Sequence, residues 1–143
     1  TLEHQNTMDQ TDTLLSALSE INTPLIFTMP NVDLKSGIIR AMINKFADSH
    51  ENVQIVENLG PSGYFSVMKY SSMMVGNSSS GIIEAMSFEL PVVNVGYRQS
   101  GRVRSKNVID VGNKRDEVLA GIQQALTQEF RYQIKGSKIL YGD

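Results

Sequence analysis

The sequence predicts an α/β fold, a three-layer sandwich in which helices cover both faces of a mostly parallel sheet. Short apolar runs alternate along the chain with longer segments whose apolar residues recur every three or four positions. The short runs are apolar at nearly every position, as strands are when both faces of their sheet are covered. A length of 143 residues with 41% hydrophobic residues suits one compact domain.

In the first half of the chain, the sequence pattern predicts a helix followed by a strand, and then a second helix followed by a second strand. Leu14, Leu15 and Leu18 have helical spacing, and Pro24 and Pro30 bound a short apolar run that is typical of a buried strand. The elements expected here are a helix over residues 8–20 capped by Asn6 or Thr7, a strand over 25–29, a long helix that opens at Asp33 or Leu34, and a strand over 53–56.

In the second half, glycines and prolines mark the boundaries. Gly60, Pro61 and Gly63 indicate a turn, and Pro91 indicates the entry to a strand. The elements expected here are a helix over residues 64–70, a strand over 72–75, a helix that ends near 88, strands over 92–95 and 108–111 with a loop over 96–104 between them, a helix over 116–128, and a further helix in the tail 129–143.

Composition and charge exclude several classes of protein. The net charge is -2 and the pI about 5.7, with no basic cluster of the size that nucleic-acid binding needs. The chain has no cysteine, and no spacing of histidines and carboxylates predicts a metal site. No apolar run reaches the roughly 18 to 20 residues that cross a bilayer, and no signal-peptide pattern is present. We expect a cytoplasmic protein with no metal, membrane or nucleic-acid partner.

Residues 75–85, Val-Gly-Asn-Ser-Ser-Ser-Gly-Ile-Ile-Glu-Ala, contain the most informative motif. A strand leads into a turn at Ser78, Ser79 and Ser80, and Gly81 lets another group approach the backbone as a helix begins. The N-terminus of a helix presents unpaired N–H groups and a partial positive charge, which favour a phosphate. The alternative is a polar turn with an ordinary helix cap.

Three further segments also follow predicted strands. In open parallel sheets, ligands bind outside the carboxyl ends of the strands. Residues 31–33, 59–64 and 96–104 are therefore expected at the same edge as the serine turn. Together these four segments would define one binding site.

The motif at 75–85, with Pro91 and Arg-Gln-Ser-Gly-Arg at 98–102, resembles the hydrolysing UDP-N-acetylglucosamine 2-epimerases of bacterial sialic acid and related nonulosonic acid biosynthesis, including that of polysialic acid capsules. Thr-Met-Pro-Asn-Val-Asp at 28–33 is similar to a second signature of that family. The matching motifs occur in the same order along the chain as in the family, and the resemblance covers about residues 28–111. It implies a Rossmann-like domain, the C-terminal half of a glycosyltransferase B type fold.

The resemblance also implies what this half does. Residues 1–143 would be a single UDP-binding domain of an enzyme that converts UDP-N-acetylglucosamine, or a modified diamino sugar, to an N-acetylmannosamine-type sugar and UDP without a cofactor. In the family the catalytic carboxylates lie mainly in the N-terminal domain, so this chain alone is expected to contain no catalytic residue and to be inactive.

A family element that reads roughly His-Pro-Val-Thr-Leu-Glu matches here only from Thr1 onward. Its histidine and the strand before it are expected to be missing. A neighbouring chain, as in a homodimer, or a rearranged segment would then fill the gap in the sheet.

Roles for individual residues follow from this resemblance and from their chemistry. The serine turn and Gly81 would hold the diphosphate, and Glu84 would accept both ribose hydroxyls. Arg98 and Arg102 would pair with the doubly charged diphosphate, although solvated loop arginines are the usual case. Arg104 is expected at the surface.

Two other positions have a structural alternative. Tyr64 would contact the uracil ring, or else pack on the core at the start of its helix. Asn31 would position its loop or the acetamido group, or else cap the long helix.

Two other functions remain open for the chain. One is a retaining glycosyltransferase with the same UDP site, and the other is a non-enzymatic α/β domain that binds an anion or a partner protein. A receiver domain would need acids at the strand ends, where this chain has serines.

Overall fold

The computed structural model describes residues 2–28, 34–57, 60–76, 85–96 and 106–135. The chain divides into two compact units, Thr1–Gly60 and Pro61–Asp143. Each unit contains parallel strands accompanied by helices, which confirms the predicted α/β class. The prediction of a single domain stays a prediction. Among the described residues, no helix is long and apolar enough to cross a membrane.

The first unit contains α1 (Leu2–Leu18), β1 (Leu25–Thr28), α2 (Leu34–Asp48) and β2 (Val53–Val56). The two strands pair in parallel, with Leu25 opposite Val53. Helix α1 packs on α2, and α2 packs on β2. This is the arrangement expected when a helix connects two parallel strands.

The core of the first unit is centred on Phe46, which is buried with Ile43 and Val53. The ring of Phe27 meets Phe46 edge-on at 6.0 Å between centroids. On the other side, His50 stacks on Phe46 at 4.1 Å, and its Nδ1 lies 2.8 Å from the Phe46 carbonyl oxygen. The aromatic contacts therefore join β1 to the C-terminal turn of α2.

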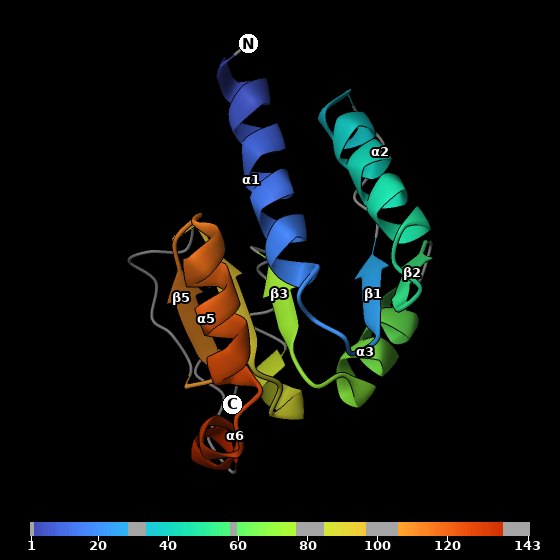
Figure 1. Cartoon of the computed structure of the whole chain (residues 1–143). Helices are drawn as coiled ribbons and strands as arrows, with labels where there is room; N and C mark the ends of the chain where they lie inside the picture. The colour runs from blue at the N-terminus through green and yellow to red at the C-terminus, as the bar shows by residue number, and fades with distance from the viewer. Residues whose placement is uncertain (1, 29–33, 58–59, 77–84, 97–105, 136–143) are drawn as a thin grey trace. The chain divides into compact units, whose positions relative to one another are not determined.

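The second unit is built on a three-stranded parallel sheet in the order β3-β4-β5. Its elements are α3 (Gly60–Tyr70), β3 (Met74–Gly76), the 3₁₀ helix η1 (Ala85–Phe88), β4 (Val92–Val95), β5 (Val108–Val111), α5 (Arg115–Ala125) and α6 (Gln128–Ile134). Figure 1 shows α5 lying across β5.

Helical segments pack on both faces of this sheet. On one face Gly121 of α5 approaches the strands so closely that a Cβ there would lie 2.7 Å from Val111 Cγ1 and 3.2 Å from Val93 Cγ1. On the other face Val92 packs with Met68 of α3 and Ala85 of η1. The second unit therefore has the three layers that the sequence predicts.

The predictions of helix boundaries were wrong in three places. Helix α1 begins at Leu2, not at residue 8, because no glycine or proline interrupts the residues before Met8. The expected turn at 60–63 is the first turn of α3, because Pro61 has the φ angle that a first helical residue needs. The helix expected over 116–128 ends at Ala125. The start of the helix expected before residue 88 lies outside the described residues, and its described end is η1.

The tail helix is confirmed as α6, within the second unit. Phe130 and Ile134 are buried and pack with Ile109 of β5. Thr127 separates α6 from α5 because its hydroxyl oxygen accepts a hydrogen bond from the Phe130 N–H at 3.2 Å. An N-cap of this kind starts a new helix within a sequence that would otherwise extend the previous one.

Replacing Thr127 with alanine is expected to lower the free energy of unfolding by about 1 kcal/mol, the usual cost of losing an N-cap. Thr127→Ser keeps an oxygen in the capping position and should cost less than half as much. Urea unfolding followed by far-UV circular dichroism measures both. Equal losses in the two variants would show that the threonine methyl group, and not the cap, stabilises α6.

Candidate functional site

The carboxyl ends of β3, β4 and β5 lie at one edge of the second unit's sheet, because the three strands are parallel neighbours. We call this edge, formed by Gly76, Val95 and Val111, the ligand edge. Gly76 has a φ of 150° and Gly96, which follows β4, a φ of 93°. Other residues rarely adopt such angles, so glycine suits both positions, at the end of β3 and directly after β4.

Most of the predicted site residues lie outside the described residues. Those are Asn31, Ser78, Ser79, Ser80, Gly81, Glu84, Arg98 and Arg102. By chain order, residues 77–84 follow β3 and residues 97–105 follow β4, so both segments leave the sheet at the ligand edge. In the first unit, residues 29–33 follow β1, and residues 58–59 come shortly after β2.

Tyr64 is the one predicted site residue that the structure describes. It lies in α3, half-buried, and packs against the cluster that contains Met68 and Val92. The centroid of its ring is 6.5 Å from that of Phe65, which is partly exposed. This packing favours the core role for Tyr64, and its contact with a uracil ring stays a prediction.

The structure also shows a polar pair that the sequence reasoning missed. Asn94 of β4 lies opposite Asp110 of β5, and its Nδ2 donates a hydrogen bond to Asp110 Oδ1 at 2.7 Å. Asn94 is only 1% exposed, whereas Asp110 is exposed. The signal that could have revealed the pair is one polar residue at the third position of each of two otherwise apolar strands.

A second buried asparagine holds the opposite, amino end of the sheet. Asn107 is fully buried, and its Nδ2 donates to the Leu90 carbonyl oxygen at 2.9 Å. Its backbone carbonyl accepts a hydrogen bond from Val92 N–H at 2.8 Å. Asn107 therefore fixes the start of β4 against the start of β5, away from the ligand edge.

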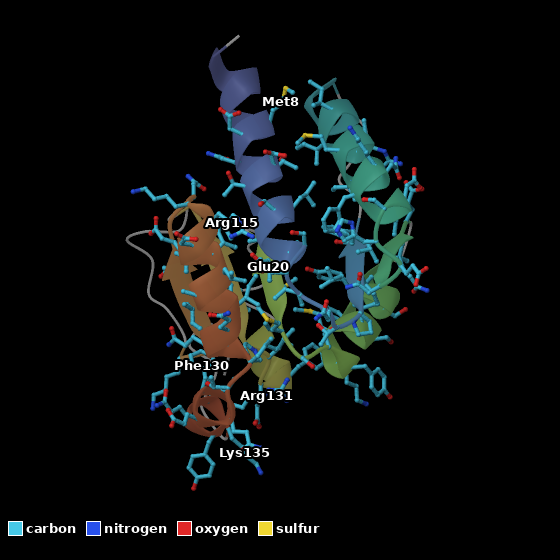
Figure 2. The ribbon with its side chains drawn as sticks, in the orientation of Figure 1. Met8, Glu20, Arg115, Phe130, Arg131 and Lys135 are labelled. Carbon is cyan, nitrogen blue, oxygen red and sulfur yellow. The ribbon has the colours of Figure 1, made fainter. Side chains whose placement is uncertain are left out.

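A hollow of about 420 Å³ is lined by Gln128, Glu129, Tyr132 and Gln133 of α6. Figure 2 shows α6, marked by Phe130 and Arg131, at the far end of α5 from Arg115. Arg131 donates to the carbonyl oxygen of Ser72, which precedes β3. The hollow therefore lies near the amino end of the strands and is not part of the ligand edge.

The described residues contain no group of three or more His, Asp or Glu side chains that could hold a metal ion. Polar groups near the described ligand edge include the amide of Asn94 and the carboxylate of Asp110, and the side chains of Asn113 and Glu117 lie close to Gly96 and Gly112. An edge of this kind can hold an organic ligand through hydrogen bonds.

Parallel strands with helices on both faces, and a ligand edge at their carboxyl ends, define a Rossmann-like α/β domain. The family model of the UDP-N-acetylglucosamine 2-epimerases matches residues 1–143. The chain belongs to this family, and the resemblance seen in the sequence is confirmed.

The curated relatives are longer proteins. The chain is 42% identical over 134 residues to the UDP-N,N'-diacetylbacillosamine 2-epimerase (hydrolyzing) of Legionella pneumophila, covering 94% of this chain and 34% of the relative. It is 34% identical over 143 residues to the polysialic acid biosynthesis protein P7 of Escherichia coli, covering 99% of this chain and 36% of that protein. The chain thus spans about a third of the length of these relatives.

Solved structures show the same fold. The UDP-GlcNAc 2-epimerase of Neisseria meningitidis bound to UDP-GlcNAc matches with a TM-score of 0.75 and 17% identity, over 94% of this chain and 37% of that one. The Methanocaldococcus jannaschii UDP-GlcNAc 2-epimerase in complex with UDP-GlcNAc and UDP matches with a TM-score of 0.68 and 14% identity, over 100% of this chain and 38% of that one. These matches confirm the predicted fold, one half of a glycosyltransferase B arrangement.

Proposed function

We propose that this chain is the UDP-binding half of a hydrolysing UDP-N-acetylglucosamine 2-epimerase, which gives an N-acetylmannosamine-type sugar and UDP. The observation that carries the proposal is the match of the family model to all of residues 1–143. The relative from Legionella, which is 42% identical, is itself named a hydrolysing 2-epimerase. In open parallel sheets, ligands bind outside the carboxyl ends of the strands, and this supports a nucleotide site at the ligand edge.

The proposed reaction has two steps and needs no cofactor. A base removes the proton from C2 of the sugar, the C1–O bond breaks, and UDP leaves with the bonding electrons to give a glycal. Water then adds across the double bond, with its hydroxyl on C1 and a proton on C2, so that C2 is inverted. This half of the enzyme would stabilise the negative charge that develops on the departing UDP.

Each predicted site residue would bind a different part of the nucleotide sugar. Ser78, Ser79, Ser80 and Gly81 would donate hydrogen bonds to the diphosphate, and Arg98 and Arg102 would neutralise it. Glu84 would bind the ribose, Tyr64 the uracil, and Asn31 its own loop or the acetamido group. A helix N-terminus alone contributes only about 0.3 to 1 kcal/mol, so the hydroxyls and guanidinium groups must supply most of the affinity.

The catalytic carboxylates would come from a second, N-terminal domain, because the relatives are about three times as long as this chain. Residues 1–143 would then form one UDP-binding domain that is inactive alone. The E. coli relative is named for polysialic acid biosynthesis. We place the enzyme in the cytoplasm, at the step that supplies the amino sugar for sialic or related acids of capsule polysaccharide.

Calorimetric titration of the chain with UDP tests the nucleotide site. Saturable binding is expected, and Ser79→Ala and Arg98→Ala should each weaken it by about tenfold or more, because a hydrogen bond to a charged group is worth about 1.5 to 3 kcal/mol. Arg104→Ala removes the same charge from the same loop and should change the dissociation constant by less than about twofold. No binding at millimolar UDP, or equal losses in both arginine variants, would contradict the assigned site.

A second experiment identifies the sugar of the substrate, because the Legionella relative is named for a diacetylbacillosamine nucleotide and not for UDP-N-acetylglucosamine. A fusion of this chain to the remaining, N-terminal part of that relative should release UDP and a free sugar from UDP-N-acetylglucosamine or from UDP-N,N'-diacetylbacillosamine. The substrate with the higher kcat/KM identifies the sugar. Transfer of the sugar to an acceptor, without free sugar, would instead support the glycosyltransferase alternative.

A further inference from the structure

An asparagine occupies the same position at the amino end of each parallel sheet. Asn52 directly precedes β2, and Asn107 directly precedes β5. The backbone carbonyl of each asparagine accepts a hydrogen bond, at 2.8 Å, from the first N–H of the neighbouring strand. The donors are Leu25 of β1 and Val92 of β4. The two units therefore begin a strand pair with the same backbone contact.

The side-chain amides of the two asparagines also bond in the same way. Asn52 Nδ2 donates to the Thr23 carbonyl oxygen at 2.9 Å and to the Ile21 carbonyl oxygen at 3.1 Å. Asn107 Nδ2 donates to the Leu90 carbonyl oxygen at 2.9 Å. Thr23 and Leu90 each lie two residues before the neighbouring strand begins. Each asparagine therefore holds the neighbouring chain segment at two points, one by its backbone and one by its side chain.

The residue between these two points is a proline in both sheets. When each register is extended by one residue, Pro24 comes opposite Asn52 and Pro91 comes opposite Asn107. Proline has no backbone N–H and is tolerated at the start of a strand. We call each asparagine, together with the two bonded residues that flank the proline, a clamp. The first clamp is Asn52 with Thr23 and Leu25, and the second is Asn107 with Leu90 and Val92.

The strands that the clamps join are short. β1, β2, β4 and β5 contain four residues each, whereas strands usually have about five or six. Parallel pairing is also slightly less stable per residue than antiparallel pairing. Because a pair of this length has few ladder hydrogen bonds, one further bond beside its first residue has a large effect on local opening there.

Packing does not explain the amide of Asn107. Asn107 is fully buried, and its Oδ1 makes no hydrogen bond with any described residue. An unpaired buried acceptor destabilises the folded state, and an apolar side chain such as leucine would avoid this cost. An apolar side chain would also lose the hydrogen bond from Nδ2 to Leu90. The bond that the amide donates is therefore the property that favours asparagine at this position.

We propose that Asn52 and Asn107 align the first residues of two parallel strand pairs and hold them against local opening. Each side-chain amide fixes the carbonyl before the proline, while the backbone carbonyl of the asparagine binds the N–H after it. Without the amide, the N–H of Leu25 or Val92 exchanges faster with solvent, while the rest of the strand stays paired. The clamps lie at the amino ends of the strands, so this role is independent of any ligand at the ligand edge.

Asn52→Asp tests the donated hydrogen bonds in the first unit. Aspartate has nearly the same shape but no Nδ2 donor, and its carboxylate would face two carbonyl oxygens. We expect hydrogen exchange of the Leu25 N–H, measured by NMR at neutral pH, to be about tenfold faster, as in Asn52→Ala. The Val92 N–H belongs to the other unit and is the internal control, with a change under about twofold. Wild-type exchange at Leu25 in Asn52→Asp would show that only the shape of the side chain matters and would overturn the proposal.

Asn107→Leu is the matched variant in the second unit. Leucine has the same number of side-chain heavy atoms and removes the Nδ2 donor together with the unpaired Oδ1. We expect exchange of the Val92 N–H to be about tenfold faster, with the Leu25 N–H now the control. Asn52 is half-buried, so its variants keep the proposal falsifiable even if Asn107→Leu does not fold. Equal acceleration along the whole strand in either variant would indicate general destabilisation and would overturn the proposal.

Discussion

Replacing Ile122 with alanine is expected to lower the free energy of unfolding by about 3 kcal/mol, among the largest losses for a single side chain of this protein. Ile122 is 1% exposed, on the buried side of α5 together with Val118 and Ala125. The change removes buried methyl and methylene groups and leaves a cavity that a helix held against a sheet cannot close fully.

Urea unfolding with far-UV circular dichroism measures this loss. With a slope of about 1.5 kcal/mol per molar urea, the midpoint should fall by about 2 M. The control is Leu126→Ala at the C-cap of the same helix, where an equally large side chain is 38% exposed and should cost less than about 1 kcal/mol. Similar midpoints for the two variants would mean that α5 does not cover the sheet as the structure shows.

The strands could be predicted from the sequence to the residue in three cases. The ranges 53–56, 92–95 and 108–111 coincide with β2, β4 and β5. Each is a short run of mainly apolar, β-branched residues; Pro91 directly precedes β4, and Gly112 directly follows β5. For β4 and β5, whose sheet is covered on both faces, burial and local propensity favour the same conformation, so the local pattern is sufficient.

Helix boundaries were harder to predict than strands, because turns and the first turns of helices favour the same residue types. Gly60 and Pro61 suit a turn, but proline also suits the first position of a helix, and α3 begins there. Thr127 occurs within a helical pattern, and its extended backbone together with its hydrogen bond from Phe130 N–H shows that a second helix starts at that point. The choice between these readings depends on packing, which the local sequence does not contain.

The polar pair could not be predicted for a different reason. Asn94 and Asp110 are 16 positions apart in the chain and look like isolated interruptions of two apolar runs. They meet only because β4 and β5 are parallel neighbours in one register, a tertiary property. By contrast, the position of residues 77–84 and 97–105 after parallel strands could be predicted from chain order alone, because it needs only the direction of the strands.

Replacing Gly121 with valine should cost about 3 kcal/mol, the upper part of the range for overpacking a core. A Cβ on Gly121 would lie 2.7 Å from Val111 Cγ1 and 3.2 Å from Val93 Cγ1, closer than carbon atoms can approach without movement. Both neighbours are β-branched and buried, so they cannot rotate away easily. Helix α5 would therefore have to move off the sheet.

The control is Gly37→Val in α2, where no heavy atom of the described residues lies within 4 Å of the new Cβ. Valine has a slightly better helix propensity than glycine, so this change should leave the free energy of unfolding within about 0.5 kcal/mol. Hydrogen exchange of the β4 and β5 amides gives a local measure, since Gly121→Val should speed exchange there and Gly37→Val should not. Slow exchange in both variants would show that α5 can tilt without opening the sheet, and the close approach at Gly121 would then have no effect on stability.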